Sequence, residues 1–135
     1  YWDAFVDYMK NHPSKLFRTR SASYDHWMSI AIGKSGIHIA LLLNKREQKA
    51  TIQLYMSDDA DKKYFDALVK CKEEAEEQIG IKLTWRRLDN KKASTIDIYK
   101  SGDLSNPTSR EEIFGWYREY TEKFITFFKP IIKKL

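Results

Sequence analysis

Three consecutive segments between residues 28 and 56 alternate apolar and polar side chains, and this pattern constrains the fold more than any other feature. Successive side chains of a β-strand point to opposite faces of a sheet, so apolar residues confined to one phase predict a sheet with one buried face. Polar segments over residues 33–36 and 45–49 separate the three strands, which predicts an antiparallel meander. The apolar positions are Met28, Ile30 and Ile32, then Ile37, Ile39, Leu41 and Leu43, then Ile52, Leu54 and Met56.

A second hairpin is expected later in the chain. Residues 81–86 alternate again, which puts Trp85 on the buried phase and Arg86 on the opposite, uncovered one. A polar turn over residues 88–92 then leads to a fifth strand over 95–99.

Helical periodicity predicts three helices. The first opens the chain, with Trp2 and Phe5 on its apolar face, and the second runs from about residue 60 to 79. The segment 57–59 is a good N-cap region for the second helix, and Gly80 is placed to end it.

The last helix, over residues 109–129, carries the strongest periodic signal. Ser109 and Glu112 have the spacing of a capping box, and Pro130 is expected to end or kink the helix. Its apolar stripe, predicted to be core, consists of Ile113, Trp116, Tyr117, Tyr120, Phe124, Phe127, Phe128 and Ile131.

These elements predict an α+β fold with a mostly antiparallel sheet of about five strands. The expected order is α-βββ-α-ββ-α, with the helices packed mainly on one face. A length of 135 residues favours a single domain over 1–135. The chain opens at Tyr1, inside a helical pattern, which indicates the C-terminal part of a longer protein; the alternative is that only a tag and a few residues are missing.

Composition narrows the function classes. The single cysteine, Cys71, can form no internal disulfide and favours the cytoplasm. No stretch approaches the roughly 18 consecutive apolar residues of a membrane span. The histidines, His12, His26 and His38, are too scattered for a metal site. We therefore expect no membrane association, no metal and no cofactor.

No catalytic residue is assigned, and an enzyme is the least favoured function class. Glu47-Gln48-Lys49 with an upstream carboxylate such as Asp25 has the residue types of a restriction-type nuclease site. However, Glu47 and Lys49 fall in a predicted turn, which cannot hold a metal rigidly. The segment 33–36 leads into a strand and not a helix, so it is a hairpin turn and not a phosphate loop.

Charge is unevenly distributed along the chain, whose net charge is +5. Residues 10–49 hold 8 basic and 2 acidic residues, residues 82–100 hold 6 and 2, and residues 58–79 hold 4 and 8. A polarised basic surface attracts polyanions, so weak, sequence-independent nucleic-acid binding is one hypothesis. The candidate residues for this binding are Arg86, Arg87, Lys91, Lys92, Arg46, Lys49 and Tyr55. Tyr55 is included because it falls out of the apolar phase and could stack on a base.

The order of the segments resembles a prokaryotic family, domain of unknown function 4268. The resemblance is carried by Trp2-x-x-Phe5, the strand 27–32 with its Gly33-x-Ser35-Gly36 turn, Leu54-Tyr55, Phe65-x-x-Leu68, Lys72-Glu73 and Glu76, Gly80-Ile-x-Leu83-x-Trp85, Lys92-Ala-Ser94-x-Ile96, Trp116 and Phe124-x-x-x-Phe128. It implies a domain often found at the C-terminal end of longer bacterial and archaeal proteins, some with a restriction-endonuclease-like part before it. It implies no established activity and no site residues.

Two partner classes therefore stay open. One is an accessory module that associates with nucleic acid, and the other is a module for protein interaction or self-association. Clustered Arg and Lys on the uncovered sheet face would favour the first, and a large apolar patch there would favour the second.

Overall fold

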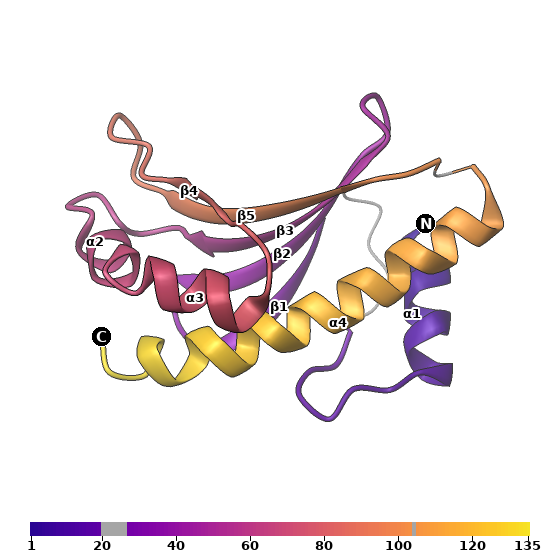
Figure 1. Ribbon diagram of the computed structural model, residues 1–135, viewed down its shortest axis with the longest axis horizontal. Coiled ribbons are helices and arrows are strands. Elements are labelled where there is room, and N and C mark those ends of the chain that lie inside the picture. The colour runs from indigo at the N-terminus through magenta and orange to yellow at the C-terminus, as the bar shows by residue number, and fades with distance from the viewer. Residues whose placement is uncertain (20–26, 104) are drawn as a thin grey trace.

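The computed structural model describes residues 1–19, 27–103 and 105–135. Within them a five-stranded antiparallel sheet carries its helices on one face (Figure 1), which confirms the predicted α+β class. In chain order the elements are α1 (Trp2–Asn11), β1 (Trp27–Lys34), β2 (Ile37–Asn44), β3 (Lys49–Met56), α2 (Lys63–Val69), α3 (Lys72–Ile79), β4 (Thr84–Arg86), β5 (Ser94–Ser101) and α4 (Pro107–Ile132).

The sheet has the strand order β1-β2-β3-β5-β4. Its central pairs match apolar residues across strands, with Ile39 opposite Leu54 and Leu54 opposite Ile96. Along β3 the buried and half-buried residues alternate strictly, as the sequence pattern predicts. The β1–β2 turn lies where expected, and Gly33 and Gly36 both take the positive φ that such tight turns need.

The expected helix over 60–79 is two helices. The N–H of Cys71 donates to the carbonyl of Leu68, three residues back, and this tighter turn separates α2 from α3. Each half buries its own apolar pair, so the sequence periodicity continues across the break. Gly80 ends α3 in the left-handed conformation, as predicted.

The predicted fourth strand is shorter than expected. The carboxylate of Glu76 accepts the N–H of Leu83 at 2.8 Å, so the backbone before Thr84 is bound to α3 and not to a neighbouring strand. The same carboxylate accepts the indole N–H of Trp85 at 3.4 Å, and the Trp85 ring meets Phe65 edge to face at 6.3 Å.

Both predicted ends of α4 were wrong. The cap is Asn106, whose side chain accepts the N–H groups of Thr108 and Ser109, and Pro107 fills the first turn, where a missing N–H costs nothing. Pro130 does not end the helix, which continues to Ile132. Pro130 lies near the C-terminus on an exposed position, so water can satisfy the one carbonyl that its ring leaves unpaired.

The core lies between the covered face of the sheet and α4, with α1 against the same helix. Phe124 and Phe128 are fully buried there, whereas Trp116 is only half-buried. Phe5 of α1 packs at 5.3 Å from the rings of both Phe114 and Tyr117.

We predict that Phe124→Ala lowers the free energy of unfolding by about 3 to 5 kcal/mol, because it leaves a cavity in this core. Trp116→Ala should cost only about 1 to 2 kcal/mol, since part of its ring already contacts water. Chemical denaturation of both variants measures the difference. If both variants lose the same free energy of unfolding, Trp116 is buried as fully as Phe124, contrary to the structure.

Candidate functional site

The sheet face that points away from the helices, here called the open face, is covered by no helix of the described residues (Figure 1). Strand register arranges its side chains in three rows, because directly paired residues of antiparallel strands share a face. The rows are Trp27, Leu42, Thr51 and Tyr99; then Ser29, Ala40, Gln53, Asp97 and Thr84; then Ala31, His38, Tyr55, Thr95 and Arg86.

Two turns stand above the open face at its two ends (Figure 1). One joins β2 to β3 over residues 45–48, and the other joins β4 to β5 over residues 87–93. The pairing of Lys49 with Ser101 and of Met56 with Ser94 places these turns at opposite ends of the β3–β5 ladder. One turn of each basic segment therefore stands at an end of this surface.

The seven residues that the sequence suggested for nucleic-acid binding differ in their exposure and in their ion pairs. Arg46, Lys91 and Lys92 are exposed in the turns, and their side chains make no ion pair within the described part of the chain. Lys49 has its ammonium 4.1 Å from the ring centroid of Tyr99 and 3.8 Å from the Glu47 carboxylate. It begins β3 at the edge of the open face.

Arg87 is held by acidic neighbours. Its guanidinium donates two hydrogen bonds of 3.0 Å to Asp66 on α2 and a further one to Asp89. The hydrogen bond to Asp66 raises the pKa of Arg87, and the same bond lowers the pKa of Asp66. Arg87 therefore ties the second turn to α2, and we assign it no phosphate contact.

A buried lysine, which sequence reasoning missed, also fixes the second turn. The ammonium of Lys62 donates to the carbonyls of Lys91 and Ala93 at 2.7 and 2.8 Å and to the hydroxyl of Ser94 at 3.2 Å. Lys62 takes a positive φ of 62° just before α2. Only the contacts show this role, because a Lys in a polar segment normally faces solvent.

Asp97 is the second residue that sequence reasoning missed. It lies in the middle row of the open face yet is only 1% exposed. One carboxylate oxygen accepts the Tyr99 hydroxyl at 3.0 Å and lies 3.5 Å from the Arg86 guanidinium. Within the described part of the chain the other oxygen has no hydrogen-bond partner. A sequence signal existed, since an acidic residue between Ile96 and Ile98 marks the polar phase of a strand.

Burial is the main cause of the raised pKa of Asp97, because a carboxylate loses its hydration there. Hydrogen bonds from Tyr99 and Gln53 and the charge of Arg86 act in the opposite direction without cancelling it. Asp97 thus anchors two exposed groups, the Arg86 guanidinium and the Tyr99 ring, on the open face.

A hollow of about 360 Å³ lies on the open face beside this cluster. Its lining residues are Trp27, Ser29, His38, Ala40, Leu42, Gln53 and Tyr55. The small side chains of Ser29 and Ala40 form the floor, and the larger residues of the two outer rows rise on either side. Tyr55, 5.2 Å from the His38 ring, stands in one wall.

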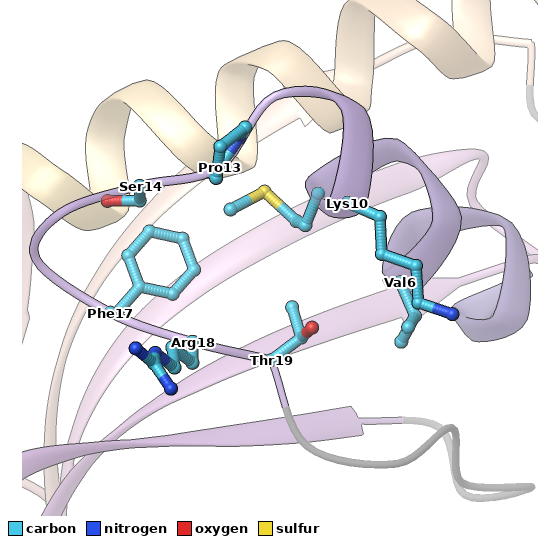
Figure 2. A pocket seen from close by; sticks show the side chains of 8 residues that line it. Val6, Lys10, Pro13, Ser14, Phe17, Arg18 and Thr19 are labelled. Carbon is cyan, nitrogen blue, oxygen red and sulfur yellow. The ribbon is translucent and has the colours of Figure 1, made fainter.

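A second hollow, of about 680 Å³, lies between α1 and the segment that follows it (Figure 2). Val6, Met9 and Phe17 give it an apolar lining, and among the residues that the structure describes there Lys10 and Arg18 are the ionised ones. The hydroxyl of Ser14 in this lining donates to the Glu122 carboxylate of α4 at 2.7 Å.

The nuclease hypothesis gains no support. Glu47 lies in the turn, as expected, whereas Lys49 is the first residue of β3 and not part of the turn; Asp25 lies outside the described residues. Residues 1–19, 27–103 and 105–135 contain no group of three or more His, Cys, Asp and Glu side chains that could hold a metal ion. In those same ranges no helix is long and apolar enough to cross a membrane.

Comparison with known proteins connects the chain to one family. The model of this family, described as domain of unknown function (DUF4268), matches residues 1–132 and confirms the resemblance seen in the sequence. No curated protein and no solved structure matches the chain.

We predict that Asp97 makes the protein less stable as pH rises above 3.8, its ordinary pKa. The raised pKa means that the folded state holds this proton more tightly than the unfolded state, so stability falls with rising pH until the folded-state pKa is passed. Asp97→Asn cannot titrate. The free energy of unfolding of wild type minus that of Asp97→Asn, measured by urea titration between pH 3.5 and 7, should therefore decrease with pH. An increase would contradict the raised pKa.

Proposed function

The chain belongs to the family described as domain of unknown function (DUF4268), and we propose from its geometry that it binds single-stranded nucleic acid on the open face. One observation carries the proposal. Exposed aromatic side chains lie on a sheet face whose two ends are flanked by basic turns on the same side (Figure 1).

The basic turns suit the phosphate backbone. Arg46 stands at one end and Lys91 and Lys92 at the other, all exposed and none paired with an acidic side chain of residues 1–19, 27–103 or 105–135. Cations of this kind bind phosphates by releasing condensed counterions, which needs no particular base sequence. The acidic helix α3 lies on the other side of the sheet (Figure 1), so its carboxylates are kept away from a strand bound on the open face.

The aromatic residues favour a single strand over a duplex. Trp27 is 48% exposed and Tyr99 38% exposed, and Tyr55 lies half-buried between them and the second turn. Bases can stack on such rings only when they are unpaired, and stacking contributes about 1 to 3 kcal/mol per base. Arg86, which Asp97 holds on the same face, adds a planar cation beside them.

A protein partner is the second candidate function. Trp27 is exposed on β1, which has only one neighbouring strand, β2, in the described sheet. An exposed apolar residue on an edge strand is a feature of surfaces that pair with another chain. In that case the molar mass in solution should rise with concentration.

We predict that the triple variant Arg46→Glu, Lys91→Glu and Lys92→Glu weakens binding to single-stranded DNA by at least about tenfold at low salt. Removal of three phosphate contacts should also make the slope of log K against log salt shallower by about 2. Fluorescence anisotropy with a labelled oligonucleotide of mixed sequence measures both quantities.

The matched control carries the same charge change on the side of the helices, as Lys72→Glu, Lys133→Glu and Lys134→Glu. These side chains are exposed as well. The control should keep most of the affinity, because only the position of the charge differs. Equal loss in both variants would reduce the effect to net charge, and absence of any wild-type binding at low salt would reject the proposal.

A further inference from the structure

The exposed side of α4 carries a third hollow, of about 430 Å³, here called the basic hollow. Lys129 and Lys133 at the end of α4 line it, together with Lys15 and with Leu16, which is 46% exposed. None of these three lysines pairs with an acidic side chain among the described residues. Unpaired cations around an exposed apolar side chain suit an acidic protein surface.

The chain carries such an acidic surface on α3. Glu73 and Glu77 are exposed, one helical turn apart, on the side of α3 opposite to the buried Ala75 and Ile79. Their carboxylates make no ion pair within residues 1–19, 27–103 and 105–135. Exposed, unpaired charges of both signs therefore lie on two helices that cover the same face of the sheet (Figure 1).

The two charged surfaces lie on opposite sides of one ridge of α4, which Thr126 marks. Thr126 is exposed and lines both the basic hollow and the groove in which α4 meets Gln78 and Ile79 of α3. Successive residues of a helix are rotated by about 100°. Phe127, one step from Thr126, lines the groove at α3, and Ile125, one step in the other direction, lines the basic hollow.

We propose that the basic hollow receives α3 of a second copy of this chain. A two-fold axis along the ridge of α4 exchanges the two sides of the ridge, so it lays α3 of each copy over the basic hollow of the other. The two glutamates of one copy then face the α4 lysines of its partner, and this contact occurs twice in the dimer. Both charged pairs are four residues apart, about 6 Å along a helix, so their charges can match one to one.

This dimer is independent of the proposed function, because the open face lies on the far side of the sheet and stays uncovered (Figure 1). The charged side chains are all exposed, so water and salt screen them and each pair contributes little. Burial of Leu16 under α3 adds an apolar contact. We therefore expect a weak dimer that forms at high protein concentration and low salt.

The test inverts the charge of one surface at a time. One variant carries Lys129→Glu and Lys133→Glu, and the other carries Glu73→Lys and Glu77→Lys. Sedimentation equilibrium at low salt should show the molar mass of wild type rising with concentration from one chain toward two. Each variant alone places like charges opposite each other, so its dimer dissociation constant should rise at least about tenfold.

An equal mixture of the two variants should recover the affinity of wild type. In the mixed dimer the inverted lysine surface of one copy meets the unchanged signs' opposite on its partner, so every contact again joins a carboxylate to an ammonium group. A mixture that associates no better than the separate variants would overturn the proposal. So would a dimer that both variants form as well as wild type, because it must use another surface.

The matched control is Lys91→Glu with Lys92→Glu, which makes the same charge change in a turn at the open face. This control should form the dimer like wild type while losing affinity for single-stranded DNA. Lys129→Glu with Lys133→Glu should do the reverse, so the dimer and the proposed function fail separately.

A measurement on wild type alone does not depend on the fold of a variant. Raising the salt concentration to about 0.5 M should weaken the dimer at least about tenfold, because the Debye length shrinks to a few ångströms. A dimer that resists this salt, or absence of any dimer at low salt and about 1 mM protein, would overturn the proposal.

Discussion

The packing of α4 against one face of the sheet is the interaction on which the rest of the structure depends. This helix has 26 residues, about 39 Å in length, and its side chains Tyr117, Phe124 and Phe128 are fully buried. The Tyr117 hydroxyl also donates to the carbonyl of Leu42 at 2.7 Å, which fixes the helix to the middle of β2. Because α1, α3 and α4 all lie on this one side, no helix of the described residues covers the opposite face of the sheet.

Two buried polar side chains, Asp59 and Lys62, fix the turn between β4 and β5 at one end of the open face. Asp59, 1% exposed, accepts the N–H groups of Tyr64 and Phe65 at the start of α2 and donates its own N–H to the carbonyl of Lys92. Lys62 binds the same turn through three oxygen atoms. An ordered turn loses less entropy when it binds a partner, so this arrangement would favour the phosphate contacts that we propose for Lys91 and Lys92.

The sequence predicts well whatever follows from periodicity. Alternation identified the strands and their buried side chains. Gly80 marked the end of α3 because glycine adopts the left-handed conformation of a helix C-cap without a steric penalty. Predictions failed where one contact overrides the pattern. The Glu76 carboxylate holds Leu83 and delays β4, Asn106 caps α4 in place of Ser109, and the chain turns at Cys71 inside an uninterrupted helical pattern.

The residues of the candidate site also fall into those that the sequence pattern predicts and those that only the folded chain reveals. Charge counts along the chain located both basic turns, and the phase of Tyr55 put it on the open face. Asp97 could be recognised as polar within an apolar strand, but its burial depends on Tyr99 and Arg86 covering it, which no pattern records. The role of Lys62 depends on a turn nearly thirty residues away, which only the folded chain brings into contact.

The burial of Asp97 is itself an argument for a site on the open face. A carboxylate without full hydrogen bonding is costly to bury, and the fold has no need of a charge there, since Thr or Val would suit the pleated sheet better. What Asp97 does is hold Arg86 and Tyr99 on one face, through the ion pair with the first and the hydrogen bond from the second. The β3–β5 ladder spans eight residues, about 26 Å, with a basic turn at each end and this cluster between them. A strand lying along that ladder can contact cations at both ends and aromatic and amide groups between them. A polar cluster maintained against its desolvation cost, at the centre of such a surface, is the arrangement expected where bases are recognised.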